Sequence, residues 1–381
     1  MMGKSALWVR RTFGTVGHFI RNHVVLVVAA LAALVTCFLV PPDGEYLGYF
    51  DWKTLACLFM TLGVVCALRN IKFFTILARK IVSLAGNLRL LAVILIVMTF
   101  IGSMIIANDM ALITFLPIGY FALSVTGQEK HSAYIFILQN ISANLGGMVT
   151  PFGNPQNLYL YSYFNIPTGK FTLIMLPPFL LAIAMLIGCC FLLKPEKLEI
   201  HGELSEPLSA WRTAAYLCLF ALSILSVFRV LPWWICLIVI LIGLLVLDRK
   251  CLLSVDYPLL LTFTMFFIFS GNLSRYEAVR TAMEQLLSKS PLLVSLCSCQ
   301  CISNVPTAIL LSRFTGDYRA LLYGVNIGGT GTLIASLASL ITYSEYAIFD
   351  PKGKKKYLLL FAAVNIIFLV VMTAVTALWF V

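Results

Sequence analysis

Charged residues are scarce in this sequence. Asp, Glu, Lys and Arg make up only 11% of its 381 residues, whereas average soluble chains carry roughly 25%. Hydrophobic residues account for 61%, the mean hydropathy is +0.96, and apolar sequence runs from residue 24 to residue 381 without a soluble segment. This composition excludes a soluble globular domain and predicts an all-α polytopic membrane protein.

Several motifs of catalysis and energy use are absent as well. The sequence has no Walker motif, no dinucleotide-binding fingerprint and no nucleophile with its base, so neither an ATP-driven pump nor an enzyme is expected, and no cofactor is predicted. The eleven cysteines lack the spacing of a disulfide framework or a zinc site and are interpreted as small hydrophobic residues. The net charge of +11 comes from basic residues in short loops that do not alternate with aromatics, so it indicates membrane topology and not nucleic-acid binding.

Helix-breaking residues cluster at one place in the first half of the chain. The apolar pattern from 132 to 161 contains Gly146, Gly147, Gly153 and Pro155 within ten residues, so one continuous helix cannot form there. A helix broken inside a membrane leaves backbone groups unpaired, which hydrocarbon does not tolerate unless the break lines a polar cavity or binds a ligand. The stretch is therefore predicted to be a broken helix at a binding site.

A similar pattern recurs in the second half. Asn326, Gly328 and Gly329 repeat the spacing that Asn144 has with the first glycine pair, about 180 residues earlier. This predicts a second broken helix at 320–344. Two broken helices in two halves of one chain indicate a transporter.

Each half is expected to follow the same plan. Opening spans lead to an amphipathic stretch, an apolar hairpin, a broken helix and a last span, which gives about nine spans, two re-entrant hairpins and two broken helices. The first hairpin has the alternative of being two short spans. The predicted divisions are a cytoplasmic N-terminus at 1–23, a first repeat at 24–193 with an amphipathic stretch at 69–89 and a hairpin at 88–125, a cytoplasmic loop at 194–210, and a second repeat at 211–381 with an amphipathic stretch at 273–290 and a hairpin at 291–315.

Positive charge is unevenly divided between the two predicted sides. With the N-terminus in the cytoplasm, the loops on that side hold 19 of the 27 Lys and Arg residues and leave 8 outside. The positive-inside rule therefore places the N-terminus, and the loop that carries Lys352 to Lys356, in the cytoplasm of a multi-pass protein of the cell membrane. The first hairpin then enters from the cytoplasm and the second from outside, so the two repeats are predicted to be inverted.

Asp109 is the one acid of sixteen that lies inside an apolar stretch and not in a loop or at a span end. A carboxylate in such a place is costly and marks a functional site, so Asp109 is predicted to bind the coupling ion. The alternative is a water-exposed hairpin tip at which Asp109 caps a helix that begins at Met110.

Asn108 and Asn304 occupy matching places at the centres of the two hairpins. Each would present an amide at the N-terminus of a helix, whose free N–H groups attract anions. Two such tips from opposite sides would form one midplane site for a small anion without any Lys or Arg. Freed carbonyls in the breaks, with nearby Asn, Ser and Thr oxygens, would hold sodium. The alternative role for such an Asn is a helix–helix hydrogen bond.

The predicted substrate- and ion-binding residues gather at the two tips and the two breaks. Those of the first half are Asn108, Asp109, Asn144, Gly146, Gly147, Thr150, Gly153 and Asn154. Those of the second half are Ser303, Asn304, Thr307, Asn326, Gly328, Gly329, Thr330 and Thr332. A coupling sodium ion is expected at Asn108, Asn304 and the two breaks.

Four segments at these places resemble a known family. They are IANDMALITFLPIG, TPFGNPQNLYLY, ISNVPTAILL and GVNIGGTGTLIASLASL. In this order they are similar to the citrate-transporter-like permeases of the ion transporter superfamily, a group related to the divalent anion/sodium symporters and to the arsenite-pump membrane subunits. The resemblance covers nearly the whole chain. It implies a homodimer in which a transport domain, made of the hairpins and broken helices, moves like an elevator against a scaffold.

The hairpin tips depart from the symporter pattern. In the dicarboxylate symporters each tip carries Ser-Asn-Thr, which binds sodium and a substrate carboxylate. The matching positions here are Ala107 to Asp109 and Ser303 to Val305, and only the Asn is kept in both. The Ala-Asn-Asp version is more similar to the arsenite-type branch, in which an acid would couple protons.

The sequence therefore predicts a secondary active transporter of a small anion, a carboxylate or an inorganic oxyanion, coupled to sodium or protons and working by alternating access. The alternatives are a sodium/proton antiporter that uses Asp109 and binds no anion, an arsenite-type efflux permease, and a channel or non-transporting receptor. The expected partners are the lipid bilayer, the small anion and a second copy of the chain.

The predicted topology is tested by cysteine labelling on an otherwise thiol-free background. Because positive charge holds a loop in the cytoplasm, Lys354→Cys should react with an impermeant thiol reagent only after the cells are opened, and Val381→Cys should react from outside. Labelling of position 354 in intact cells would reverse the map.

Overall fold

The computed structural model describes residues 23–198 and 208–380. Over these residues the chain is α-helical, with short 3-10 turns and a single isolated β-bridge in place of any strand. The all-α polytopic fold predicted from composition is confirmed. Most of the predicted segment 1–23, part of the predicted loop 194–210, and Val381 lie outside the described residues.

The first half contains two opening helices, a short helix, a hairpin, a broken helix and a long helix. It begins with α2 (Val24–Leu39), the 3-10 turn η1 (Gly44–Tyr49), α3 (Trp52–Asn70) and α4 (Phe73–Val82). The hairpin is α5 (Leu88–Ile106) and α6 (Asn108–Val125), followed by η2 (Glu129–His131). The broken helix is α7 (Ser132–Gly146), η3 (Gly147–Val149) and α8 (Pro155–Tyr163), and α9 (Thr168–Cys190) ends the half.

The second half has a closely similar order. It begins with α10 (Ala210–Val227), α11 (Trp233–Leu247), α12 (Arg249–Leu253), α13 (Tyr257–Arg275) and α14 (Glu277–Lys289). The hairpin is α15 (Pro291–Ile302) and α16 (Asn304–Leu311), and the broken helix is α17 (Tyr318–Ile327), η4 (Leu333–Ala335) and α18 (Leu337–Phe349). The last helix is α19 (Lys354–Phe380). That the two halves are inverted copies stays a prediction.

Several elements differ from their predicted bounds. The amphipathic stretch 69–89 holds only the ten-residue α4, because the left-handed backbone at Lys72 (φ 58°) interrupts the helix before it. The second broken helix extends past its predicted end at residue 344, since α18 runs to Phe349. The last helix starts at Lys354, so Lys354, Lys355 and Lys356 lie in its first turn, whereas Lys352 stays in the loop before it.

Seven helices in the described part of the chain are long and apolar enough to cross a membrane: α3, α5, α6, α9, α10, α13 and α19. The predicted spans α2 and α11 are shorter, at 16 and 15 residues. The arms of the first hairpin have 19 and 18 residues, whereas those of the second have 12 and 8. Length alone therefore does not separate a hairpin arm from a span, and the position of the tips has to decide.

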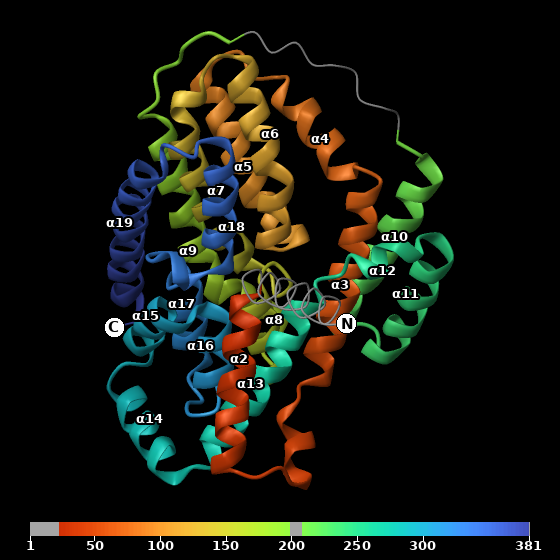
Figure 1. The fold of residues 1–381 in the computed structure, drawn as a ribbon, viewed down its shortest axis with the longest axis vertical. Coiled ribbons are helices and arrows are strands. Elements are labelled where there is room, and N and C mark those ends of the chain that lie inside the picture. Colours follow the sequence, from red (N-terminus) through yellow and green to blue (C-terminus); the bar gives the residue numbers. More distant parts are fainter. Residues whose placement is uncertain (1–22, 199–207, 381) are drawn as a thin grey trace, which may run out of the picture.

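The two hairpins approach the middle of the molecule from opposite ends, α5 and α6 from the upper end and α15 and α16 from the lower end (Figure 1). Each turns at a single non-glycine residue with positive φ, Ala107 (φ 68°, ψ 153°) and Ser303 (φ 74°, ψ 160°). This backbone region destabilises such residues by on the order of 1–3 kcal/mol. Two strained turns at matching places indicate that the geometry of the tips serves a site.

The helices fall into two groups. In the span group, α2 packs along α13, and α10 and α11 pack against α3. In the hairpin group, α5 and α6 pack against α7, α15 and α16 pack against α17, and α9 and α19 lie against the broken helices. The groups meet where α13 contacts α16 and where α3 contacts α8, while α4 bridges α3 and α6.

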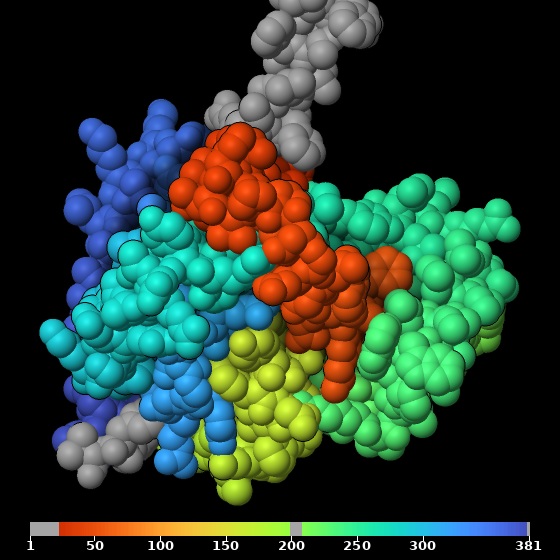
Figure 2. Space-filling view, turned by 90° about the horizontal axis from the view of Figure 1, so that it is seen from below, coloured from red at the N-terminus to blue at the C-terminus, as the bar shows by residue number. Residues whose placement is uncertain are grey.

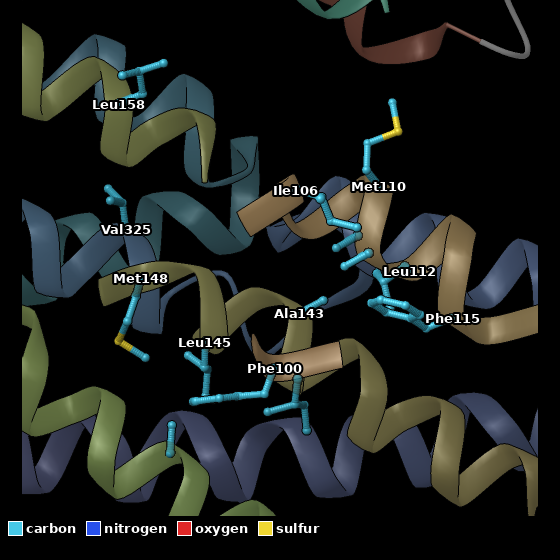
Figure 3. Packing of buried hydrophobic residues seen from close by; sticks show 14 of the residues in the cluster. Phe100, Ile106, Met110, Leu112, Phe115, Ala143, Leu145, Met148, Leu158 and Val325 are labelled. Carbon is cyan, nitrogen blue, oxygen red and sulfur yellow. The ribbon is translucent and has the colours of Figure 1, made fainter. Parts of the chain in front are cut away.

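The glycines at the first break are required by space and not by backbone conformation. Gly146 and Gly147 both have an ordinary right-handed φ of −66°. A Cβ on Gly146 would lie 2.3 Å from the carbonyl oxygen of Phe100, because α5 and α7 approach closely there. Figure 3 shows the buried apolar side chains around this contact, among them Phe100, Leu145 and Phe115. Close packing therefore holds the hairpin against the broken helix.

Arginines join the two groups at the lower end of the molecule. Arg313, which follows α16, donates to the Tyr49 carbonyl at 2.7 Å. Arg229, between α10 and α11, donates to the carbonyls of Tyr161 and Ile166 at 2.7 and 3.1 Å. Figure 2 looks onto this end, where the red N-terminal segments lie beside the teal segment of α13 and α14, and the yellow-green segment lies between the blue and the green ones. The hairpin and span groups are thus bound together at the lower end.

A substitution tests the close packing at the first break. Gly146→Ala should lower the stability of the purified protein by roughly 1–3 kcal/mol, because the added methyl group meets backbone atoms that cannot move without shifting a helix. Gly188→Ala is the matched control, since a Cβ there meets nothing within 4 Å, and its melting temperature in detergent should equal that of the wild type or exceed it slightly. Equal melting temperatures for the two variants would contradict the packing.

Candidate functional site

The tips of both hairpins line one cavity of about 660 Å³. Asn108 and Asp109 reach it from α6, and Ser303 and Asn304 reach it from the turn into α16. The beginnings of α2, α8 and α13 and one side of α18 form the rest of the wall. The other polar residues in this wall are His23, Gln156, Asp256, Thr262, Ser336, Ser344 and Glu345.

The two tip asparagines have the same local geometry. Asn108 Oδ1 accepts a hydrogen bond from the next backbone N–H at 3.0 Å, and Asn304 Oδ1 does so at 2.9 Å. Because each oxygen is occupied by its own helix, each side chain presents its amide nitrogen. Asn108 Nδ2 lies 3.4 Å from Asn144 Oδ1, and Asn304 Nδ2 lies against Gly329 of the second break. Both tips thus offer hydrogen-bond donors at a helix N-terminus, which suits the oxygens of an anion or an acid.

Asp109 does not cap a helix. The strained turn at Ala107 makes α6 begin at Asn108, one residue before the acid, and Asp109 Oδ1 is buried without a hydrogen-bond partner. The alternative in which Asp109 caps a helix beginning at Met110 is therefore wrong. A buried polar atom without a partner is destabilising, and an acid in this state is suited to take up a proton or a cation.

Four buried asparagines lie at the two breaks behind the cavity wall, and the side-chain amides of three of them link the breaks. Asn154 Nδ2 donates to the Asn144 carbonyl at 3.0 Å and to Asn326 Oδ1 at 3.2 Å. Asn326 Nδ2 donates in turn to Asn157 Oδ1 at 2.6 Å, and Asn157 Nδ2 donates to the carbonyls of residues 147 and 148 at 3.4 and 3.2 Å. All four side chains are at most 2% exposed. They supply partners for backbone groups that the broken helices leave free.

At the second break, Gln300 of α15 supplies hydrogen-bond partners for the free backbone groups. Its Nε2 donates to the carbonyls of Gly328 and Thr330 at 2.8 and 3.1 Å, and its Oε1 accepts from the Thr332 amide at 2.9 Å. Thr330 Oγ1 donates to the carbonyl of residue 327 at 2.6 Å, and Thr307 Oγ1 donates to that of residue 303 at 2.7 Å. The hydroxyls of Thr307 and Thr330 therefore bond to nearby backbone. Gln300, Thr307 and Thr330 do not line the cavity.

Some of the predicted site residues line the cavity, and the others lie outside its wall. Four of the sixteen line the cavity: Asn108, Asp109, Ser303 and Asn304. The other twelve lie outside this wall, in hydrogen bonds to neighbours or in close backbone packing, and Thr332 among them is exposed: Asn144, Gly146, Gly147, Thr150, Gly153, Asn154, Thr307, Asn326, Gly328, Gly329, Thr330 and Thr332. Sodium binding at the breaks stays a prediction.

Sequence reasoning missed Gln156, Asp256 and Ser336 as cavity residues. Gln156 is 1% exposed and its Oε1 has no partner, and its signal was a glutamine in an apolar run directly after the break. Ser336 Oγ donates to Asn144 Oδ1 at 2.7 Å, a contact between segments 192 residues apart that no local pattern announces. The sequence marks Asp256 only as the start of a span, and it indeed caps α13.

Among the residues that the structure describes, the cavity wall carries acids but neither Lys nor Arg. Asp109, Asp256 and Glu345 line it, together with His23. An anion held here would depend on the tip amides and helix N-termini, whereas the acids favour a proton or a cation. The described part of the chain has no group of three or more His, Cys, Asp and Glu side chains that could hold a metal ion. Sodium would therefore need amide and backbone oxygens, such as the unpartnered Asn154 Oδ1.

Comparison with known proteins gives several relatives, some of which are named as transporters. An uncharacterized transporter of Methanocaldococcus jannaschii is 31% identical over 294 residues, which cover 77% of this chain and 80% of that protein. The inner membrane protein YbiR of Escherichia coli is 29% identical over 305 residues, which cover 76% of this chain and 79% of that protein. A protein of Oryza sativa subsp. japonica named as a silicon efflux transporter is 30% identical over 179 residues, 46% of this chain and 36% of its own length.

The family is shown by a longer match. The family model described as citrate transporter matches residues 7–315, which is most of the chain and includes the first hairpin, the first break and the second hairpin. The resemblance predicted from the four segments is confirmed, and the family and the transporter names among the relatives describe permeases and not enzymes. The chain is a membrane transporter that belongs to the citrate transporter family.

Proposed function

We propose that this protein is a secondary active transporter of a small anion, a carboxylate or an inorganic oxyanion, coupled to protons or sodium. The observation that carries the proposal is the convergence of two hairpin tips on one cavity, each with an Asn at the start of a helix. Each tip adds an amide donor to the positive end of a helix dipole. Anion oxygens bound between the tips would therefore need no Lys or Arg.

The proposed working cycle is alternating access, with this structure facing the cytoplasm. The cavity wall extends along α18 to Glu345, near the point where Phe349 stacks on Tyr120 of α6 with ring centroids 3.9 Å apart. This is the end at which the first hairpin is anchored, and the positive-inside rule assigns it to the cytoplasm of a cell-membrane protein. At the opposite end, Arg229 and Arg313 join the hairpin group to the span group.

Movement of the hairpin group would open the other side. We propose that α5 to α9 and α15 to α19 move together against the span group, in a homodimer, as the family resemblance implies. The arginine bonds at the lower end would then break, and the tips would carry the anion past α13 and α3.

A second candidate substrate is an uncharged oxyacid. Two observations favour it: the wall has three acids without Lys or Arg, and it offers acceptors such as Gln156 Oε1 beside the tip donors. A protonated oxyacid carries both hydroxyl donors and oxygen acceptors, so it matches such a wall. The name of the rice relative, a silicon efflux transporter, agrees with a substrate of this class.

Removal of the tip amides tests the two-tip site. Asn108→Ala and Asn304→Ala should each reduce transport at least about tenfold, the effect of losing roughly 1.4 kcal/mol of ligand interaction. Asn365→Ala is the matched control, because Asn365 is a fully buried asparagine of α19 that lies outside the cavity wall. Uptake into proteoliposomes and melting temperature are measured together. Normal transport by both tip variants would disprove the site.

Asp109→Asn tests the coupling group. The amide keeps the shape of the side chain and removes its charge, so uptake should lose its dependence on the imposed proton or sodium gradient. Substrate should still exchange across the membrane when no gradient is present. A sodium/proton antiporter without a separate substrate would be inert in both assays.

The third outcome for Asp109→Asn is unchanged gradient-driven accumulation. In that case the acid does not couple, and the driving ion would have to be sodium held by oxygens at the breaks, with Asn154 Oδ1 as the side-chain ligand to mutate next.

A further inference from the structure

A second cavity lies beside the first and shares two acids with it. It is small and enclosed, with a volume of about 20 Å³, and a volume of roughly 10–15 Å³ is enough for one water molecule. Asp109 and Asp256 line both cavities. Most of the remaining wall of the small cavity is apolar and includes Leu58, Leu62 and Leu158. Both acids therefore border one small space whose other walls are mostly apolar.

Few other charges face this pair. Asp109 Oδ1 has no hydrogen-bond partner, and neither acid forms an ion pair within the described residues. From α3, Arg69 reaches only the sulfur of Met110, at 3.6 Å, and Figure 3 shows Met110 pointing away from the apolar layer around Leu112 and Phe115. In the larger cavity, His23 before α2 and Glu345 of α18 are the other titratable side chains among the residues that the structure describes.

A neighbouring side chain extends the site. Gln156 lines the larger cavity next to Pro155, which lies in both walls. It is 1% exposed, and its Oε1 is buried without a hydrogen-bond partner. An unoccupied acceptor beside two acids needs a donor, and a protonated carboxyl group or a water molecule supplies one.

Building on the proposed transport function, we infer that Asp109 and Asp256 form a carboxylate pair that holds one proton between them while the cavity faces this side. Two ionised carboxylates beside the same small, mostly apolar space repel each other, so the pair holds one proton. The proton comes from water in the larger cavity and returns to it, so the pair alternates between net charges of −1 and −2. Asp256 is thereby assigned as a second coupling residue.

The pair connects parts that move against each other. Asp109 belongs to the hairpin group, whereas Asp256 caps α13 of the span group, with its Oδ1 accepting from the Leu259 amide at 3.0 Å. Movement of the hairpin group separates the two carboxylates. The corresponding residues of the other half are Asp51, which caps α3 in the same way, and Val305 at the second tip. Because position 305 is a valine, Asp51 has no acid to pair with. The proton is therefore held more tightly only while the cavity faces the side on which Asp109 and Asp256 meet.

Asp256→Asn tests the pair with the cap retained, because Asn caps helices as well as Asp does. Without the second charge, the Asp109 proton should be lost at lower pH, and the midpoint of the pH profile of gradient-free substrate exchange should move down by about one unit. Asp51→Asn makes the same change at the matching cap and should leave the profile of the wild type.

Infrared titration of the purified, non-transporting protein gives a readout independent of flux. The carbonyl band of a protonated carboxyl group should vanish in Asp109→Asn and titrate at lower pH in Asp256→Asn. If Asp109→Asn is uncoupled but both profiles of Asp256→Asn equal those of the wild type, the pair is disproved and the proposed function stands. If Asp109→Asn keeps normal coupling, the coupling assignment itself fails. A profile that depends on sodium and not on pH would overturn the shared proton in favour of a bound cation.

Discussion

A helix that breaks inside a membrane must find new partners for its backbone, and this requirement organises the structure. The carbonyls freed at the first break bond to Asn154 and Asn157, and those at the second break bond to Gln300 of the neighbouring hairpin. Asn326 joins the two breaks through Asn154 and Asn157. The side chains of Asn154, Asn157 and Asn326 are buried and bonded to one another, so they hold both breaks in one arrangement. The hairpin tips lie against this arrangement, which places them on a common cavity.

The chemistry of the cavity is set by the polar groups that are not used to bond the freed backbone. The amides behind the wall are occupied by backbone, whereas the tip asparagines and Gln156 keep atoms available to a ligand. No Lys or Arg of the described segments lies in the wall to balance the acids. Donors at the tips and acids at the side divide the site into a place for substrate oxygens and a place for a proton or cation. In the proposed function this division lets the substrate and the coupling ion influence each other without sharing the same ligands.

Much of this arrangement could be predicted because its signals are local. Glycine and proline in apolar sequence mark the breaks, and Asn108 and Asp109 are conspicuous within a hydrophobic hairpin. The positive φ at Ala107 could not be foreseen, since alanine gives no sign of an unusual backbone. The role of Gly146 differed from the expected one: it admits a neighbouring helix and its own backbone stays helical.

The residues that were missed act over long distances in the sequence. Gln300 meets the second break 28 to 32 residues away, and Ser336 meets Asn144 across 192 residues. Asp256 looks like an ordinary helix cap until α13 is packed beside the first tip. Such pairings depend on the tertiary fold, so composition and spacing predict the kind of protein and the tips of the hairpins but not the supporting shell.

The central claim is that one cavity between two hairpin tips moves a small oxygen-rich solute at the expense of an ion gradient. It is tested most directly by uptake into proteoliposomes of citrate, succinate, sulfate, arsenite and silicic acid, with sodium alone as the comparison, under imposed proton or sodium gradients. The account predicts that at least one of these solutes accumulates only when the protein and a gradient are both present, and that Asn108→Ala abolishes the accumulation. Movement of sodium and protons with no solute from the panel would contradict it.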